Sequence, residues 1–159
     1  MELRFNQDNK HFTYGAKAVI IEDGCVLMVS NTGMDFYYPV GGGANHGETA
    51  QETVLREALE ETGVNYEIDR LLFVRENIFT PTGIPRWEGL LVHEVAFYFL
   101  MKPRGCKDVV CESYGFEFKE SLHWLPIEDL RGYKLYPEFL YDKIADLPQT
   151  VEHIVSKTL

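Results

Sequence analysis

The chain has 159 residues, of which 45% are hydrophobic and 25% are charged. That length suits one hydrophobic core, so we expect a single domain over residues 1–159, and the composition excludes a largely disordered chain. The formal net charge of −10 repels nucleic-acid backbones and anionic membranes, so we expect no long nucleic acid as a partner. A small phosphorylated ligand is compatible, because a metal ion and a few Arg or Lys residues can meet its charge locally.

The cysteines and the hydropathy pattern bear on compartment. Cys25, Cys106 and Cys111 are odd in number and contain no CxxC pair, which predicts free thiols rather than disulfides or a zinc site. The first ten residues are polar, and no apolar run reaches the roughly 18 residues that a membrane span needs. We therefore expect a cytoplasmic protein that has no membrane partner.

The first part of the chain predicts strands. Apolar, β-rich runs at Ala18 to Ile21 and Val26 to Val29 flank Asp23-Gly24, which is a strong hairpin signal. Aromatic residues then lead into Gly41 to Gly43, which predicts a strand running into a loop that needs unusual backbone angles.

A helix follows. Thr49 to Glu52 fit a capping box in which Thr49 is the N-cap and Glu52 reaches back to it. Gly63 is a natural stop after about thirteen residues without Gly or Pro.

The remaining segments predict more strands and a second helix. Tyr66 to Glu76 and Leu90 to Met101 read as strands, joined by a loop rich in Pro and Gly of the kind that often carries specificity. Phe116 to Trp124 predicts one more strand, and a last helix is expected from Pro137, at N1, to about Leu147. This order indicates an α+β fold, an α/β/α sandwich around a mixed β-sheet.

Three carboxylates share one stripe of the first helix. At 3.6 residues per turn, Glu61 lies roughly 40° to one side of Glu57 and Glu60 roughly 60° to the other. Like charges at these spacings repel, whereas a hard divalent cation would turn the repulsion into attraction. We expect the stripe to follow the boundary of the buried face, beside four apolar residues that face the core. These are Val54, Leu55, Ala58 and Leu59. An ordinary solvated Glu-rich face is the alternative.

The residues from Gly42 to Val64 resemble the Nudix box, whose pattern is GX5EX7REUXEEXGU with U as Ile, Leu or Val. The matching positions are Gly42, Glu48, Arg56, Glu57, Glu60, Glu61, Gly63 and Val64. Ala58 departs from the pattern, being apolar but small, for which we expect altered packing rather than lost chemistry. The sequence before the box and a WLPIEDL segment near the C-terminus extend the resemblance.

The resemblance implies an α/β/α sandwich in which a loop-helix-loop binds Mg²⁺, with Mn²⁺ as an alternative ion. The implied metal ligands are the carboxylates of Glu57, Glu60 and Glu61 and the backbone carbonyl of Gly41. The implied partners that orient these carboxylates are Arg56 and Glu48. A guanidinium beside Glu60 can fix a carboxylate by two hydrogen bonds, which agrees with this assignment.

Substrate contacts are expected mostly outside the helix. The glycines would let the backbone approach phosphates, and an indole in the long loop could stack on a base. The candidate substrate-binding residues are Gly41, Gly42, Gly43, Arg75, Arg86 and Trp87. For the last three, a structural or solvated role is the alternative, and His46 and His93 are weaker hints, His46 being expected at the surface.

A general base must take a proton from the attacking water. Glu57 is the nominal base, because a box glutamate has this role in some members of the family, whereas others use a carboxylate outside the box. The outside candidates are Glu88, Glu94, Glu112 and Glu117.

The implied activity is hydrolysis of a phosphoanhydride bond in a nucleoside diphosphate linked to another moiety. ADP-ribose, sugar nucleotides, dinucleoside polyphosphates and modified nucleoside triphosphates are all in scope. One alternative is isoprenoid diphosphate isomerisation, whose further cysteine and glutamate motifs are not evident. Another is a nucleotide-binding sensor without catalysis. By analogy with the family, the aromatic-rich strands could serve a homodimer.

Overall fold

The computed structural model describes residues 1–159 except 112–113 and 116–117, and the side chains of residues 86, 114 and 115 also lie outside the described part. The strands are β1 (Arg4–Gln7), β2 (Lys10–Val19), β3 (Ile21–Glu22), β4 (Cys25–Asn31), β5 (Tyr38–Gly43), β6 (Ile68–Phe79), β7 (Leu91–Met101), β8 (Tyr114–Gly115), β9 (Phe118–Pro126) and β10 (Glu152–Thr158). The helices are α1 (Ala50–Thr62), α2 (Leu140–Ala145) and the 3-10 helices η1 (Pro85–Trp87) and η2 (Ile127–Gly132).

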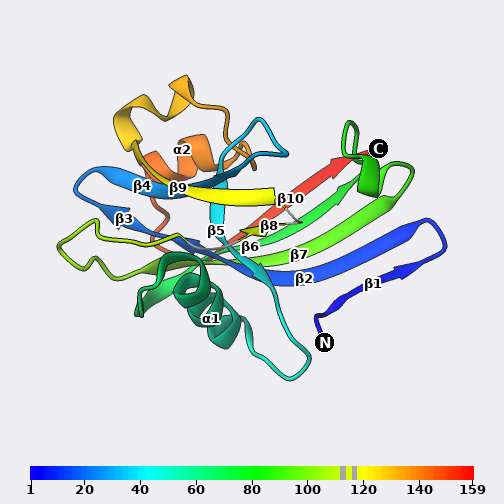
Figure 1. Ribbon diagram of the computed structural model, residues 1–159, viewed down its shortest axis with the longest axis horizontal. Coiled ribbons are helices and arrows are strands. Elements are labelled where there is room, and N and C mark those ends of the chain that lie inside the picture. Colours follow the sequence, from blue (N-terminus) through cyan, green and yellow to red (C-terminus); the bar gives the residue numbers. More distant parts are fainter. Residues whose placement is uncertain (112–113, 116–117) are drawn as a thin grey trace.

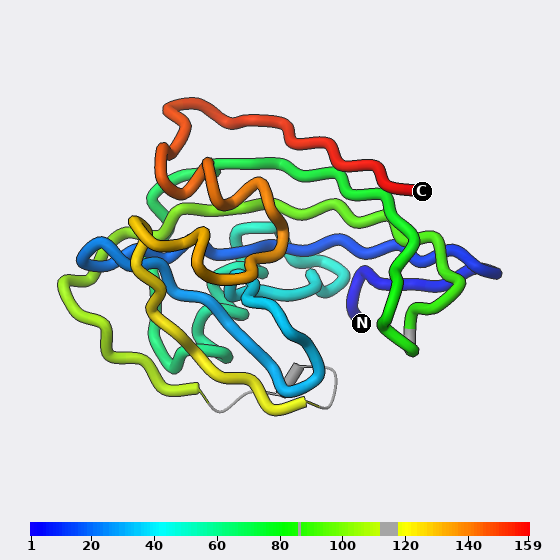
Figure 2. The backbone as a smooth tube through the Cα atoms, turned by 90° about the horizontal axis from the view of Figure 1, so that it is seen from above, coloured from blue at the N-terminus to red at the C-terminus, as the bar shows by residue number. Residues whose placement is uncertain are grey.

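These strands form one mixed sheet in the order β10-β6-β7-β2-β5-β4-β9-β8, with β1 paired to β2 and β3 to β4. Most neighbours are antiparallel, while β2 with β7 and β6 with β10 are parallel. Figure 2 shows β10, β6, β7 and β2 side by side, and Figure 1 shows α1 and α2 on opposite sides of the strands. The expected α/β/α sandwich around a mixed sheet is confirmed.

Each face of the sheet has its own apolar core. Ala16 and Ala18 of β2 face Val54 and Ala58 of α1 in one cluster. Val19, the last residue of β2, belongs to the other cluster, together with residues of η2 and α2. The alternation along β2 follows from the two-residue period of a strand, which sends successive side chains to opposite faces.

The local signals before and around α1 are confirmed. Asp23 and Gly24 have φ angles of 47° and 70° and join β3 to β4 in a hairpin. Thr49 is the N-cap of α1, where its hydroxyl accepts from the Glu52 backbone N–H and the Glu52 carboxylate accepts from Thr49. Gly63 ends the helix with a φ of 69°.

Three parts of the fold differ from expectation. The last helix begins at Leu140 rather than at Pro137, because the preceding residues form a turn in which the Leu140 N–H donates to the Pro137 carbonyl. The strands β1 and β10, at the two ends of the chain, are not anticipated. Gly41 to Gly43 were expected in a loop but lie within β5. Among these three, only Gly41 has a positive φ, of 137°. In the part of the chain that the structure describes, no helix is long and apolar enough to cross a membrane.

Candidate functional site

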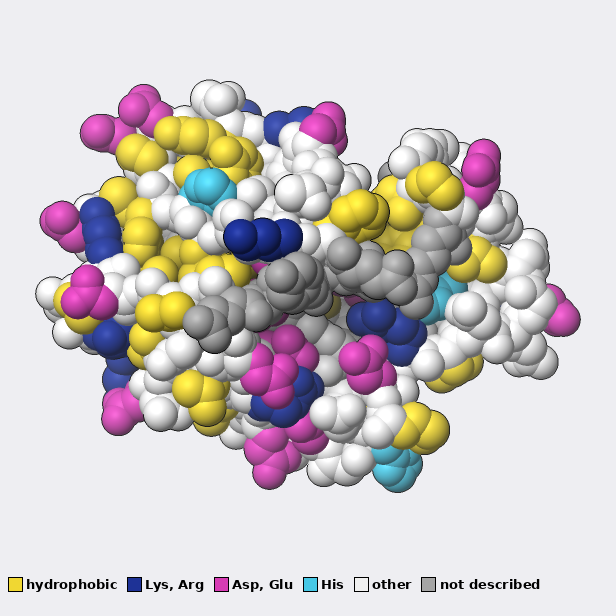
Figure 3. All heavy atoms as spheres, in the orientation of Figure 1, with side chains coloured by type: hydrophobic (Ala, Val, Ile, Leu, Met, Phe, Trp, Pro, Cys, Tyr) yellow, Lys and Arg dark blue, Asp and Glu magenta, His cyan; other side chains and the backbone are white. Residues whose placement is uncertain are grey.

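The carboxylates of α1 lie at three depths, and not along the boundary of the buried face as expected. The Glu60 side chain is 58% exposed, that of Glu57 is 15% exposed, and Glu61 is buried. Leu55 and Leu59, which were expected to face the core, are exposed instead. The buried arc of α1 is therefore centred on Glu61 rather than on the leucines. Figure 3 shows acidic side chains gathered around basic ones over this part of the molecule.

Glu61 meets the backbone of β5 at the point where that strand loses one neighbour. β5 pairs with β4 only at Tyr38 and Pro39, so its edge is open at Gly41. The Gly41 N–H donates to Oε1 of Glu61 at 3.2 Å, and Nζ of Lys17 donates to the Gly41 carbonyl at 3.3 Å. The other Glu61 oxygen, Oε2, is buried without a hydrogen-bond partner. An acceptor oxygen, a carbonyl and a cation therefore meet at this edge.

Gly42 allows Glu57 to approach the same strand. A Cβ on Gly42 would lie only 2.6 Å from Cδ of Glu57 and 2.7 Å from its two oxygens. A side chain at this position would therefore displace the Glu57 carboxylate. At Gly43 the carbonyl accepts from Nη2 of Arg56 at 2.9 Å.

Arg56 holds the carboxylates around it. Its Nε and Nη2 donate to the two oxygens of Glu48 at 2.8 and 3.0 Å, a paired arrangement that fixes the plane of the guanidinium. Nη1 donates to Glu57 at 2.6 Å and to Glu60 at 3.3 Å. Glu48 is itself anchored by the Asn45 N–H at 2.8 Å. One side chain thus joins the loop, the strand and the helix.

The protonation of these acids follows their surroundings. Burial, reinforced by the charge of Glu120, raises the pKa of Glu61 from 4.5 to about 8. Burial also raises the pKa of Glu57, against the hydrogen bond from Arg56. The hydrogen bonds from Arg56 and Asn45 lower the pKa of Glu48 to about 2. A buried carboxyl with a raised pKa becomes a strong ligand when a cation replaces its proton.

Glu120 of β9 is a member of this group that the sequence interpretation missed. It is buried, its charge acts on Glu61, and its Oε1 accepts from the Tyr38 hydroxyl at 3.2 Å. Asn31 donates to the same hydroxyl at 3.0 Å. An acid at a buried position of a strand was the available signal, but β9 places it beside α1 only through its pairing with β4.

The other predicted residues lie elsewhere. Glu88 is exposed at the end of η1 and His46 is exposed in the glycine loop, as expected for His46. Trp87 stacks on His11, with ring centroids 5.8 Å apart. Arg75 and Glu94 lie on the sheet, away from α1. Glu112, Glu117 and the Arg86 side chain are outside the described part of the chain.

No three metal-ligating side chains among the described residues converge tightly enough to enclose an ion by themselves. Mg²⁺ commonly takes only one or two carboxylates and fills its shell with water and phosphate oxygens. The unpartnered Oε2 of Glu61, on a carboxylate whose other oxygen accepts from the Gly41 N–H, fits a site of that open kind.

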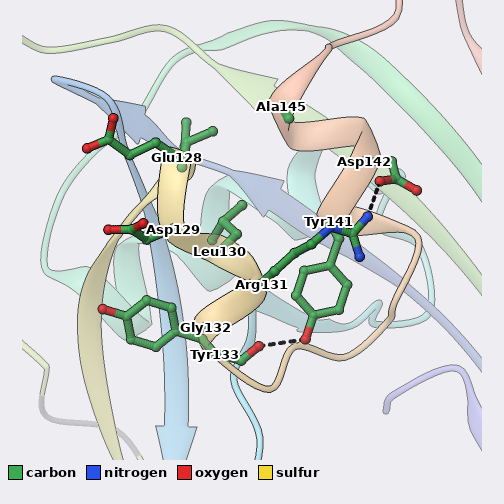
Figure 4. A pocket seen from close by; sticks show the side chains of 10 residues that line it. Glu128, Asp129, Leu130, Arg131, Gly132, Tyr133, Tyr141, Asp142 and Ala145 are labelled. Atoms are coloured by element: carbon green, nitrogen blue, oxygen red, sulfur yellow. Dashed lines mark hydrogen bonds and ion pairs between the residues drawn. The ribbon is translucent and has the colours of Figure 1, made fainter.

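A pocket of about 630 Å³ lies between η2 and α2, over the other face of the sheet (Figure 4). Two pairs of its polar groups bind one another. Arg131 binds Asp142 at 2.5 Å, and the Tyr141 hydroxyl donates to the Tyr133 carbonyl at 2.6 Å. The carboxylates of α1 do not reach it, so we place the functional site at β5 and not in this pocket.

Solved structures with the same fold agree with this placement of the elements. A MutT protein from Bacillus halodurans has a TM-score of 0.67 and 16% identity, over 89% of each chain. An ADP-ribose pyrophosphatase from Streptococcus suis has a TM-score of 0.53 and 16% identity, over 91% of this chain and 98% of that one. The NUDIX domain of Shewanella oneidensis NrtR, complexed with ADP ribose, has a TM-score of 0.58 and 17% identity, over 84% of each.

The sequence comparison gives the family itself. The model of the NUDIX domain matches residues 11–146, which include β5, α1, β9 and the whole Arg56 network. With most of its length matched and the box carboxylates gathered at β5, the chain belongs to the Nudix family.

Proposed function

We propose that the protein is a Mg²⁺-dependent hydrolase that cleaves a phosphoanhydride bond in a nucleoside diphosphate linked to another moiety. The observation that carries the proposal is the unpartnered, buried Oε2 of Glu61 beside the open backbone edge at Gly41. An isolated buried acceptor is costly in a folded protein, and a cation bound by it removes that cost.

Glu57, Glu61 and the Gly41 carbonyl would hold the ion, with Glu60 reaching it from the exposed side of α1. When bound, Mg²⁺ would neutralise charge on the diphosphate and lower the pKa of water in its shell, and Mn²⁺ could replace it. Arg56 keeps Glu57 in place at 2.6 Å, and Glu48 keeps Arg56 in place at 2.8 Å. The Lys17 ammonium lies at 3.3 Å from the Gly41 carbonyl, where a substrate phosphate would meet its charge.

Two carboxylates are candidates for the general base. Glu57 is close to the backbone of Gly42 but is already bound by Arg56. Glu120 approaches Glu61 from β9 and is oriented by the Tyr38 hydroxyl. Glu94, on the distant part of β7, is assigned a different role below. The two bases are distinguishable by the pH dependence of their variants.

The test is phosphate-coupled turnover of a panel of ADP-ribose, sugar nucleotides, dinucleoside polyphosphates and modified nucleoside triphosphates, with Mg²⁺ or with a chelator. ADP-ribose is included because it is named for two of the structures with this fold. The variant is Glu61→Gln, and the matched control is Glu128→Gln on exposed η2. Turnover that needs Mg²⁺ and collapses only in Glu61→Gln supports the hydrolase. Binding of these compounds without turnover by the wild type would favour a nucleotide-binding sensor.

A further inference from the structure

A row of small residues crosses the sheet from Gly43, the neighbour of the glycine that contacts Glu57, on the face opposite α1. Gly43 of β5 pairs with Gly15, Gly15 with Ala96 of β7, and Ala96 with Arg75 of β6. Directly paired residues place their side chains on the same face of a sheet. Three strand spacings of about 4.8 Å separate the two ends by about 14 Å. That span is comparable to the reach of an extended nucleotide from its phosphates to its base.

Arg75 ends this row with hydrogen-bonding capacity that Tyr98 and Tyr136 meet only in part. The residue is only 4% exposed, and neither Nε nor Nη1 has a hydrogen-bond partner. Its guanidinium carbon lies 5.4 Å from the ring centroid of Tyr136 and 5.7 Å from that of Phe139. A buried charged group with free donors is costly unless an acceptor meets it. The geometry points to an acceptor that a ligand supplies.

Glu94 adds an acceptor to the same face of the sheet, and we call this part of the face the floor. It pairs with Asn77 of β6 and with Thr13 of β2, one step along from the row of small residues. Asn77 is buried and donates to the Tyr136 hydroxyl at 2.8 Å, so it is held in place. A carboxylate near Arg75 would repel a second phosphate. A neutral ring with both acceptor and donor atoms on its edge suits this pair of residues.

Aromatic side chains stand on two sides of this floor. On one side, the Tyr136 ring lies 5.6 Å from that of Phe36, in the loop before β5. On the other side, η1 carries Trp87, whose ring stacks on His11 of β2. Figure 3 shows the outline of the molecule indented between the part that carries η2 and the part that carries η1. Planar rings at both sides favour a planar ligand between them.

We propose that Arg75 and Glu94 bind the nucleobase of the substrate, Arg75 donating to a ring acceptor and Glu94 accepting from a ring N–H or amino group. The identification of this moiety rests on the proposed function for the phosphate end of the site. The two residues would determine which base is accepted, because a base that leaves the buried Arg75 guanidinium unpaired, or that offers Glu94 no donor, is rejected.

The test uses the four common nucleoside monophosphates and inorganic pyrophosphate as probes, with the full chain in the presence of Mg²⁺. Calorimetry measures each dissociation constant, so no hydrolysis is needed. The variants are Glu94→Gln and Arg75→Met, and the control is Glu76→Gln. Glu76 lies on β6 beside Arg75 but faces the other side of the sheet. Thermal unfolding checks that each variant is folded.

The wild type is expected to prefer one base. In Glu94→Gln and Arg75→Met, binding of the preferred nucleotide should weaken by about tenfold or more and the preference should narrow. Both variants should bind pyrophosphate as the wild type does, and Glu76→Gln should bind every probe as the wild type does. Equal or undetectable binding of the four nucleotides by the folded wild type would overturn the proposal. The proposal would also be overturned if Arg75→Met lost pyrophosphate binding as much as nucleotide binding, since Arg75 would then be a phosphate ligand. If the protein prefers one base but shows no Mg²⁺-dependent turnover, the proposed hydrolase activity is contradicted and the proposed base-binding site is still supported.

Discussion

The Glu61 carboxylate is bound through one oxygen to the backbone N–H of Gly41, at 3.2 Å, while its other oxygen is buried without a partner. This half-satisfied carboxylate lies in the centre of the buried face of α1, where an apolar residue would pack without such a cost. The contact ties the glycine segment of β5 to the last turn of α1. It also makes the metal-free protein sensitive to pH.

In a chelator, the metal-free protein should lose stability as the pH rises. The pKa of Glu61 is 4.5 in the unfolded chain and about 8 in the fold, so the folded state binds the proton more tightly. The stabilisation is complete below the lower value and is lost as pH rises through the upper one. The slope from this group is at most about 1.4 kcal/mol per pH unit. Urea unfolding at pH 5 and pH 8 measures it.

Glu61→Gln removes this titration while keeping the shape of the side chain. The difference in unfolding free energy between pH 5 and pH 8 should shrink in this variant and stay as in the wild type in Glu128→Gln, an exposed acid. An unchanged pH dependence in Glu61→Gln would show that the carboxyl is not buried in solution.

Local signals in the sequence were sufficient for α1 and its two ends, because Thr49, Glu52 and Gly63 act on backbone groups within a few residues of themselves. The depth of each residue on the helix was not readable, since it depends on where β5 lies. Leu55 and Leu59 were therefore expected to be buried and are exposed, while Glu61 is buried. The helical period gives angles between residues but not the direction of the core.

The positions of two other residues could not be predicted, because they depend on long-range strand pairing. Glu120 joins the site only because β9 pairs with β4, which places Glu120 opposite Asn31. Arg75 was expected to contact substrate from its strand position alone, and the register that places it in line with Gly43 comes from three separate strand pairs. An acid in a strand can be noticed locally, but neither of these long-range pairings has a local sequence signal.

Arg56→Lys should lower kcat/KM by roughly 10–100-fold, because Lys keeps the charge but cannot make the two hydrogen bonds to Glu48 at 2.8 and 3.0 Å. The control is Arg131→Lys, where the pair with Asp142 is exposed and has little effect on the rest of the protein. Steady-state kinetics with a substrate from the panel measures both. Equal activity of the two variants would mean that Arg56 does not orient the site.

Gly42→Ala should reduce activity by tenfold or more without unfolding the protein. The new Cβ would lie 2.6 Å from Cδ of Glu57, so the end of that side chain must move away from the strand. A displacement near 1 Å can cost about 100-fold in rate at a catalytic site. Gly132→Ala is the matched control, because a Cβ added at Gly132 would have no heavy atom within 4 Å. If the two alanine variants have equal kcat and equal Mg²⁺ dependence, Glu57 is not held where the site needs it.

Glu120→Gln should lower kcat by about 100-fold or more if Glu120 is the general base, since general-base catalysis contributes about 10² to 10⁴. The acidic limb of the pH–rate profile should then disappear in Glu120→Gln and persist in Glu57→Gln. Tyr38→Phe, which removes the 3.2 Å hydrogen bond to Glu120, should lower kcat less while keeping the limb. The opposite pattern, in which only Glu57→Gln loses the limb, would assign the base to Glu57 and leave Glu120 as a group that positions Glu61 through its charge.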